Sequence, residues 1–537
     1  MGNILQSQST SSQIKAATRK PVRRWLSFFA PSVADILFVT LLLALSCGAL
    51  GRLLLRDADT GWHIRNGQLI LQTHTITRTD PFSSTMSGQL WYAWEWLYDV
   101  FIAIIHRALG LNGVVFFTAA LIASVFVLVL HLAMRRGGTL FVSIAFVLLA
   151  LVASTIHFLA RPHILSWLFA VIWFDLLDSA STGKDDRRIF WLPALMVLWV
   201  NLHGGFLLGF VLLGIYLAGG AIEYSAFTED REATLKWLRR VGLITALSFA
   251  ASLLNPFDYR LYIHVYQYLS NSFLMNHIAE FLSANFHSGA ALGFVMLLLI
   301  SILVLTRTRQ SIRVPQFLVI LFAIFSGLYA ARNLPISAIL AALIMAPIAS
   351  QTIIEAGSDP KLMPWTQNLF SRVHAFGERM ANLELHFRSH LWLILAFALG
   401  LGICANGGRL GTQQFIRAYF DAKVFPVEAV DVIAQRKIWE PIFCPDSWGG
   451  YLIYKLYPQT KVVVDDRHDL YGDAFLKDYI KVIQVEPEWR TVLDTKHVNW
   501  VLMPANSALA TVMRITPQWA VAHEDKTAIL FQRSERQ

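Results

Sequence analysis

The apolar runs of this chain constrain its fold more than any other feature. About eleven of them are long enough, or nearly so, to cross a bilayer as a helix, which takes roughly 20 residues. Composition agrees, because 55% of the 537 residues are hydrophobic and only 15% are charged, against roughly 25% charged in soluble domains. The sequence therefore predicts an α-helical polytopic membrane protein with helices at 33–55, 113–134, 139–160, 163–180, 189–202, 205–223, 240–255, 289–306, 315–331, 334–350 and 390–405.

The charges between these runs predict the orientation of the chain. Every second connection is basic, as expected of cytoplasmic loops. An odd number of spans then leaves the N-terminus in the cytoplasm and the C-terminus outside, in a plasma or inner membrane. The net charge of +9 follows from the same loops and gives no reason to expect nucleic acid as a partner. The basic connections contain Arg135 and Arg136 and the stretches 184–188, 229–240, 307–313 and 351–389.

Three parts of the chain follow from this topology. A basic cytoplasmic tail, 1–32, precedes a transmembrane part, 33–405, whose first external loop, 56–112, is long enough to carry a site. Residues 406–537 follow outside the membrane, and their mixture of helical patterns with the strand-like runs "KVVVDD" and "TAILFQR" predicts a small α/β domain. A further external loop, 256–288, is rich in Tyr and Phe and suits a lipid-facing groove.

The first external loop opens with a cluster of charges, "RDADTGWHIRNG" (56–67). On an extended loop, carboxylates two positions apart point the same way, so Asp57 and Asp59 could share a divalent cation such as Mg²⁺ or Mn²⁺. An Asp beside a cation stays ionised and can orient or deprotonate an acceptor. Arg65 offers the fork that matches a phosphate, and His63 is a second candidate for substrate binding. The alternative is that the aspartates cap the segment that follows, with Arg65 at the lipid headgroups.

Later in the same loop, the Trp- and Tyr-rich segment "LWYAWEWLYDVF" (90–101) predicts an amphipathic segment along the membrane surface. Glu95 and Asp99 are four residues apart and therefore share one helical face. This face either lines a catalytic cavity, in which case Glu95 binds substrate, or it is the solvated side of an interfacial helix. The spacing leaves both interpretations open.

Cationic side chains are predicted at the same membrane level as the first loop. Arg161, His163, His203 and Arg332 fall at the external ends of their spans in this topology. An external site for an anionic lipid phosphate requires such an arrangement. We therefore interpret these four residues as candidates for substrate binding, although a lone His at a helix end is more often a structural hydrogen-bonding group.

These features together resemble a family of membrane enzymes. An external first loop with an acidic motif, an odd number of spans and an external C-terminal domain are the plan of the GT-C glycosyltransferases, which use sugars linked to polyprenyl phosphate or diphosphate. Within that plan, "DTGWHIR" (59–65) is similar to the D-x-x-x-[HN]-x-R signature in the first loop of the oligosaccharyltransferase catalytic subunit. In that family the Asp belongs to a metal-bearing catalytic site. The resemblance thus implies that Asp59 is catalytic and that a divalent cation binds beside it.

The C-terminal part carries a second similarity to oligosaccharyltransferases. Its segment "DSWGGYLIYKLYPQTKVVVDDRHDLYGD" (446–473) is similar to one that begins W-W-D-Y-G-Y and runs to a strand ending in Asp-Asn. Trp448 and Tyr451 keep part of this pattern, and the resemblance implies that they bind substrate. W-W-D-Y-G itself, which reads the acceptor sequon in that family, is absent, so the resemblance does not extend to the acceptor. The chain also resembles a group of bacterial multi-spanning proteins with a D-x-D-x-x-W-H motif and a W-G-G-Y tail, which are assigned as glycosyltransferases.

Together, the residues and the resemblance predict an inverting membrane glycosyltransferase of the cell envelope. It would move a sugar or glycan from a polyprenyl-(di)phosphate donor to an external glycan, lipid or protein acceptor. Asp59, with Asp57 and a cation, would position the acceptor or act as base. The donor phosphate would be bound by Arg65, Arg161 and Arg332. Two alternatives stay open: a transporter or flippase of lipid-linked glycans, hinted at by the breaks "NLHGGF" and "ARNLP", and a non-catalytic membrane scaffold.

Overall fold

The computed structural model describes four stretches of the chain, 29–182, 187–227, 230–384 and 390–534. Most of the predicted basic tail 1–32 lies outside the described residues, as do parts of three predicted basic connections, at 184–186, 229 and 385–389.

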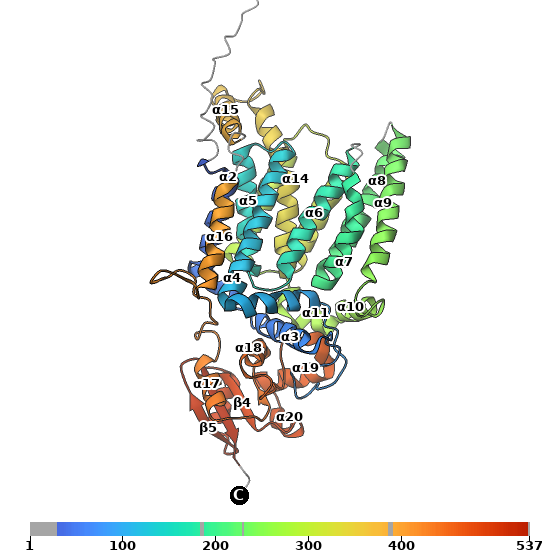
Figure 1. The fold of residues 1–537 in the computed structure, drawn as a ribbon. Coiled ribbons are helices and arrows are strands. Elements are labelled where there is room, and N and C mark those ends of the chain that lie inside the picture. Colours follow the sequence, from blue (N-terminus) through green and yellow to red (C-terminus); the bar gives the residue numbers. More distant parts are fainter. Residues whose placement is uncertain (1–28, 183–186, 228–229, 385–389, 535–537) are drawn as a thin grey trace, which may run out of the picture.

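A bundle of helices forms the larger part of the molecule, and a smaller α/β part lies at one end of it (Figure 1). Each apolar run predicted from the sequence coincides with a helix of the bundle. These helices are α2 (Val33–Ser46), α4 (Trp96–Arg135), α5 (Leu140–Ser154), α6 (His163–Ser181), α7 (Leu192–Leu202), α8 (Leu207–Ile222), α9 (Arg231–Ser252), α12 (Gly289–Leu305), α13 (Val314–Tyr329), α14 (Leu334–Ala356) and α16 (Leu391–Ala405). At the other end of the bundle lies α15 (Pro364–Glu384).

Within the described residues, five helical stretches are long and apolar enough to cross a membrane. They are Trp96–Arg135, Leu140–His157, His163–Ser181, Gly204–Phe227 and Ala331–Ala356. Shorter apolar helices of 10–17 residues include Val33–Ser46, Gly289–Leu305, Val314–Tyr329 and Leu391–Ala405. A helical, apolar architecture is thus present, whereas about eleven crossings and the sidedness of the termini stay predictions.

The long helix α4 changes direction at Gly110. This residue has φ 63° and ψ −161°, a left-handed conformation that glycine adopts at little cost and other residues do not. The part of α4 before Gly110 lies across the end of the bundle, and the part after it runs along the bundle (Figure 1). Because of this bend, the residues at the start of α4 face the α/β part.

A four-stranded sheet forms the centre of the α/β part. Its order is β3-β4-β6-β5, with β3 parallel to β4 and the other pairs antiparallel. The strands are β3 (Ile442–Phe443), β4 (Trp500–Pro504), β5 (Trp519–Glu524) and β6 (Ala528–Arg533), and a separate hairpin consists of β1 (Arg409–Leu410) and β2 (Gln413–Gln414). The helices around the sheet are α17 (Val427–Gln435), α18 (Asp446–Leu456), α19 (His468–Gln484), α20 (Trp489–Thr495) and α21 (Ala508–Arg514).

One of the two predicted strands is correct and the other is wrong. "TAILFQR" contains β6, but "KVVVDD" (461–466) forms no strand of the sheet. Instead, Val462 makes isolated bridges to Ser83 of the first loop and to Ile442. The three consecutive valines of this segment are all buried, and Val462 pairs with the first loop on one side and with β3 on the other.

The two sequence motifs meet where α18 packs against α3 (Asp59–Thr73). A Cβ atom on Gly61 would lie 2.3 Å from the carbonyl oxygen of Gly450, and one on Gly450 would lie 2.4 Å from that of Ala58. Both contacts are shorter than atoms allow, so the glycines of "DTGWH" and "WGGY" permit the close approach of the two helices. The motifs thus bring the α/β part against the first loop.

Replacing Gly450 by Ala is expected to lower the free energy of unfolding by about 1–3 kcal/mol, because the added methyl meets backbone that cannot move independently. Thermal unfolding of the purified protein in detergent measures this. Gly242→Ala is the matched control, since Gly242 is also helical and nothing lies within 4 Å of a Cβ there. An unchanged transition in Gly450→Ala would show that α18 and α3 do not pack this closely.

Candidate active site

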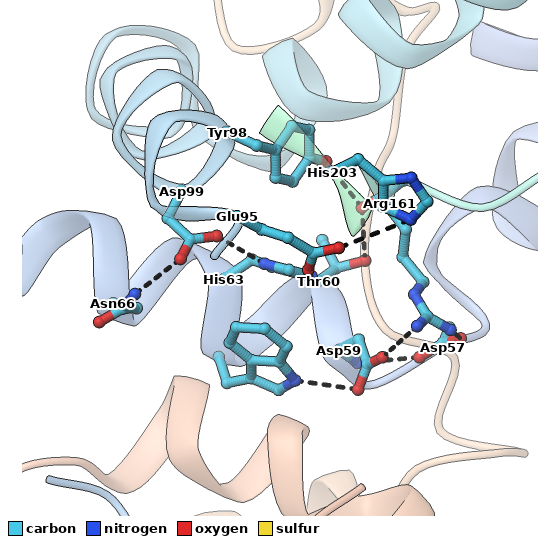
Figure 2. A network of polar contacts seen from close by, with 12 residues as sticks. Asp57, Asp59, Thr60, His63, Asn66, Glu95, Tyr98, Asp99, Arg161 and His203 are labelled. Atoms are coloured by element: carbon cyan, nitrogen blue, oxygen red, sulfur yellow. Dashed lines mark hydrogen bonds and ion pairs between the residues drawn. The ribbon is translucent and has the colours of Figure 1, made fainter. Parts of the chain in front are cut away.

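The centre of the site is an arginine held between two aspartates at the start of α3. The guanidinium of Arg161, from the turn between α5 and α6, donates from Nη1 to Asp57 Oδ2 at 2.9 Å and from Nη2 to Asp59 Oδ2 at 2.8 Å (Figure 2). Asp57 Oδ1 also accepts the backbone N–H of Asp59 at 2.9 Å. Asp57 thus makes the local backbone contact that the capping interpretation predicts. The two carboxylates also converge on Arg161, although Asp59 is helical, and their role in function stays a prediction.

Two further acids reach the same arginine or the same aspartate from distant segments. Glu280, in the short helix η6 (Ala279–Phe281), accepts from Arg161 Nη1 at 2.9 Å. Asp466, from the α/β part, is hydrogen-bonded to Asp59. Trp62 Nε1 donates to Asp59 Oδ1 at 2.9 Å. The carboxylate of Asp59 is thus surrounded by donors on both oxygens.

These neighbours set opposite protonation states for two adjacent carboxyls. Burial alone would raise the pKa of Asp59, but Arg161 and the hydrogen bonds outweigh it and hold that pKa well below its usual range. For Asp466, burial and the charge of Asp59 both raise the pKa well above its usual range. These shifts favour the ionised form of Asp59 and the protonated form of Asp466.

A second group of polar residues lies beside the first, where α3 crosses α4. Asp99 accepts from His63 Nδ1 and from Asn66 Nδ2, each at 2.6 Å (Figure 2). The two oxygens of Glu95 lie 3.7 Å from His63 Nε2 and 3.5 Å from His203 Nε2. Asp99 is completely buried, so the face shared by Glu95 and Asp99 is not the solvated side of an interfacial helix.

Glu95 differs from Asp59 in that the closest ion-pair contact of its carboxylate within the described residues is the 3.5 Å to His203. Burial raises its pKa to about 7, even though His63 opposes the shift. The pKa of His63 is raised, because Asp99 outweighs the effect of burial. A carboxyl with a pKa near neutrality can take up and release a proton under physiological conditions, which Asp59 cannot.

A cavity of about 400 Å³ lies between the first loop, η6 and the α/β part, and most of the residues described above line it. Its walls combine aromatic rings with acidic and basic side chains. They include Asp57, Asp59, Trp62, Trp91, Trp94, Glu95, Asp99, Arg161, His203, Glu280, Arg332, Asp446, Asp466 and His468. We call this the polar cavity.

A second cavity of about 480 Å³ adjoins it among the helices of the bundle. Arg161, His203, Glu280 and Arg332 line both cavities. Most of the remaining wall of the second cavity is apolar, and several of its lining residues are exposed: Val211 (39%), Leu269 (46%) and Tyr329 (62%). We call this the apolar cavity.

Arg332 has a different environment from Arg161. Its guanidinium lies over the ring of Phe281, 4.6 Å from the centroid. Among the residues that the structure describes, no carboxylate lies within ion-pair distance of Arg332, whereas Arg161 has three. Arg332 is therefore the more available cation where the two cavities join.

The structure brings most of the predicted site residues together. Asp57, Asp59, Glu95, Arg161, His203 and Arg332 line the polar cavity. His63 lies behind Glu95 and contacts Asp99. His163 lines the apolar cavity, where its Nε2 donates to the carbonyl oxygen of His157 at 2.8 Å.

Besides His63, three predicted residues line neither cavity. Arg65 donates from Nε to the carbonyl oxygen of Tyr454 at 2.7 Å and so faces α18. Trp448 is buried, with its Nε1 donating to the carbonyl oxygen of Val424 at 2.9 Å. Tyr451 is buried against Phe420 and Phe425. All three hold the α/β part together or against the first loop.

An ionic clasp fixes Asp466 in the site. The adjacent Arg467 is buried and binds Asp80 of the first loop at 2.9 Å and Asp465 at 2.7 Å. Its guanidinium also lies 4.5 Å from the ring centroid of Trp91. A buried cation needs such partners, so the clasp couples the position of Asp466 to the first loop.

The sequence predicts a divalent cation shared by Asp57 and Asp59. One oxygen each from Asp57, Asp59 and Asp466 can be chosen within 4.8 Å of one another, so an acidic cluster is present. Arg161, however, already binds both aspartates of the first loop. A divalent cation at the same oxygens would lie next to the guanidinium and be repelled by it. Asp57 and Asp59 in this arrangement therefore fit the guanidinium of Arg161, and they do not fit a metal ion beside it.

Comparison with known proteins identifies the fold. No protein-family model matches the chain, and no curated protein sequence matches it. Among solved structures, the apo oligosaccharyltransferase of Archaeoglobus fulgidus aligns over 88% of this chain and 69% of its own, at 13% identity and a TM-score of 0.52. The chain therefore has the fold of that protein, which confirms the GT-C-like fold that the sequence resemblance predicts.

Two further solved structures align less well. AglB of A. fulgidus in complex with an inhibitory peptide and a dolichol-phosphate aligns over 88% of this chain and 69% of its own, at 12% identity and a TM-score of 0.49. ArnT of Cupriavidus metallidurans bound to undecaprenyl phosphate aligns over 93% of this chain and 96% of its own, at 13% identity and a TM-score of 0.44.

Proposed function

We propose that this protein is a membrane glycosyltransferase that moves a sugar or glycan from a polyprenyl-(di)phosphate carrier to an acceptor outside the membrane. The observation that carries the proposal is the junction of the two cavities at Arg161 and Arg332. A lipid-linked sugar has an apolar chain, an anionic phosphate and a polar sugar in series. The apolar cavity, the arginines and the polar cavity follow one another in the same order.

The donor chain is proposed to enter from the side. The apolar cavity is lined by Val265, Leu269 and Met275 of the aromatic loop 256–288 and by Val211 of α8. Exposed apolar residues at its wall would contact lipid acyl chains, so a polyprenyl chain can reach the cavity without crossing water. The donor phosphate would then lie against Arg332, whose guanidinium is not neutralised by a carboxylate within 4 Å in the described part of the chain.

Carboxylates and Trp rings make the polar cavity suitable for a sugar. Carboxylate oxygens accept hydrogen bonds from sugar hydroxyls, and the rings of Trp62, Trp91 and Trp94 offer apolar faces. The archaeal oligosaccharyltransferase, whose fold this chain shares, is itself a glycosyl-transferring protein by name. That likeness adds to the proposal.

Asp59 and Glu95 are proposed to have different roles in transfer. Asp59, fully engaged and strongly ionised, orients Arg161 and the bound sugar. Glu95 takes the proton of the acceptor group as it attacks the anomeric carbon. The bond between that carbon and the phosphate oxygen breaks, and the lipid phosphate leaves toward Arg332 and Arg161. One displacement of this kind inverts the anomeric centre. The acceptor would be a glycan, lipid or protein in the cell envelope.

The chain breaks that hint at a transporter also have a place in this proposal. "NLHGGF" contains the short helix η4 (Gly204–Phe206), and "ARNLP" contains η7 (Ala331–Asn333). They hold His203 and Arg332 at the junction of the cavities. A transferase therefore accounts for both breaks, and a transporter is the outcome to consider if lipid binds and no sugar is transferred.

The experiment that tests the proposal is sugar transfer by the purified protein in detergent. Radiolabelled polyprenyl-linked sugars extracted from membranes serve as donor, with membrane lipid and glycan fractions as acceptors. Movement of label from the carrier to an acceptor or to water supports a transferase. Labelled lipid that binds without reaction supports the transporter. Absence of both binding and transfer would show that a polyprenyl-linked sugar is not the donor.

Replacing Arg332 by Gln is expected to weaken binding of polyprenyl phosphate by about 10- to 100-fold, because a charge-assisted contact to phosphate contributes roughly 1.5–3 kcal/mol. Binding of radiolabelled polyprenyl phosphate to the detergent-solubilised protein measures this. Arg260→Gln is the control, since Arg260 is an exposed arginine of α10 (Arg260–Ser270) that lines neither cavity. Equal affinity of the two variants would remove Arg332 from the donor site.

A further inference from the structure

We propose that Arg161 supplies the positive charge that a divalent cation would supply at this position, so that the site works without a metal ion. The part of the inference that concerns sugar transfer rests on the proposed function. The part that concerns cation binding does not, because it depends only on how the carboxylates are arranged.

The contacts of Arg161 are those of a central cation. Its Nη1 binds Asp57 Oδ2 and Glu280 Oε1, both at 2.9 Å, and its Nη2 binds Asp59 Oδ2 at 2.8 Å. The three carboxylates come from three places in the chain: the turn before α3, the start of α3, and η6. A planar guanidinium with five N–H donors can hold three carboxylates in fixed directions. Its side chain is only 24% exposed, so water screens these pairs little.

The remaining oxygens of the aspartate pair are also engaged. Asp57 Oδ1 accepts the backbone N–H of Asp59, and Asp59 Oδ1 accepts Trp62 Nε1. Each of the four oxygens therefore has a donor supplied by the chain itself. A metal ion would have to replace these donors, or approach the same oxygens against the charge of Arg161.

Arg161 is also placed where a leaving phosphate would need a positive charge. It lines both the polar and the apolar cavity, as Arg332 does. With Arg332 it would flank the phosphate, while Asp57, Asp59 and Glu280 keep its guanidinium in place. An arginine held in this way stabilises developing negative charge without reorganising during the reaction.

Mn²⁺ binding tests this assignment directly. We expect the wild-type protein to show no site for Mn²⁺, by isothermal titration and by the electron paramagnetic resonance signal of free Mn²⁺. Arg161→Gln should bind one Mn²⁺ at least about 100-fold more tightly than the wild type, because removing the guanidinium leaves Asp57 and Asp59 without their counter-charge. The double variant Arg161→Gln/Asp466→Asn should lose this Mn²⁺ site again. Arg332→Gln is the matched control and should gain no Mn²⁺ site.

Two results would overturn the proposal. One is stoichiometric binding of Mn²⁺ to the wild type that is lost in Asp59→Asn. The other is a folded Arg161→Gln variant that still binds no Mn²⁺, because the carboxylates would then not form a cation site at all. If Arg161→Gln does not fold, binding of Mn²⁺ to the wild type and the effect of a chelator on transfer decide the question.

A second experiment, sugar transfer in the presence of a chelator, depends on the proposed function. We expect transfer by the wild type to be the same in EDTA as in Mn²⁺. Loss of transfer in EDTA that Mn²⁺ restores would overturn the inference and leave the proposed function intact. Absence of transfer in every condition would contradict the proposed function, while the Mn²⁺ titrations would still decide which cation occupies the aspartate pair.

Discussion

Replacing Asp59 by Asn is expected to slow sugar transfer by at least about 100-fold. Asn keeps the size of the side chain but cannot balance the charge of Arg161, with which Asp59 forms a buried ion pair at 2.8 Å. Leaving one member of such a pair without its partner costs about 3–5 kcal/mol, and loss of one electrostatic contact in an active site typically costs 100- to 1000-fold in rate. Release of labelled sugar from its lipid carrier measures the effect.

Asp57→Asn provides an internal comparison for this prediction. Asp57 and Glu280 bind the same Nη1 of Arg161, so Glu280 still balances that nitrogen when Asp57 is neutral. Asp59 alone binds Nη2. We therefore expect a smaller loss in Asp57→Asn than in Asp59→Asn. Glu524→Gln, in a partly exposed ion pair with Arg514, should change little. Equal rates in wild type and Asp59→Asn would show that the aspartate pair takes no part in transfer.

Much of the fold can be predicted from the sequence because a bilayer imposes a simple rule. A segment without charge and of sufficient length has to be a helix there, so the apolar runs gave the positions of the bundle helices. The same topology puts Arg161 and Arg332 at the level of the first loop. The structure shows that Arg161 is indeed within hydrogen-bonding distance of Asp59.

The carboxylates that complete the site could not be predicted in this way. Glu280 and Asp466 reach Arg161 and Asp59 from segments more than a hundred residues away along the chain. Periodicity identifies the face of one element and says nothing about which distant element packs on it. The β-branched run that ends in Asp465 and Asp466 predicts a strand of the sheet, but Val462 forms only isolated bridges, to Ser83 of the first loop and to Ile442.

The sequence also could not show whether the "WGGY" motif of the α/β part binds substrate or packs two parts of the chain together. Trp448 and Tyr451 match positions that bind substrate in the family that the chain resembles, but here both are buried away from the cavities. Gly450 between them has the more direct role, because only a residue without a side chain lets α18 approach Ala58 this closely. In this chain the "WGGY" motif therefore packs the α/β part against the first loop through Gly450, while Trp448 and Tyr451 belong to the buried core.

Replacing Glu95 by Gln is expected to lower the transfer rate by about 100- to 10 000-fold, the usual contribution of a general base. The pKa of Glu95, ordinarily 4.5, is raised to about 7 by burial. A base acts in its ionised form, so wild-type activity should increase as pH rises through about 7. Transfer measured from pH 5 to 9 should show this limb in the wild type and no such limb in Glu95→Gln. A limb that persists in the variant would assign it to another group.

The contribution of Glu95 to the stability of the wild-type fold should fall as pH rises, whereas its activity as a base should increase. Measuring both therefore separates a catalytic from a structural role for Glu95. Because folding raises its pKa from 4.5 to about 7, the folded protein keeps a proton that the unfolded chain has released. Protonated Glu95 therefore favours the folded state fully below pH 4.5, and this contribution is lost as pH rises through about 7. Gln stays neutral at every pH. Thermal unfolding at pH 8 should accordingly show Glu95→Gln to be at least as stable as the wild type. A variant that is both inactive and less stable at pH 8 would mean that Glu95 supports the fold and does not act as the base.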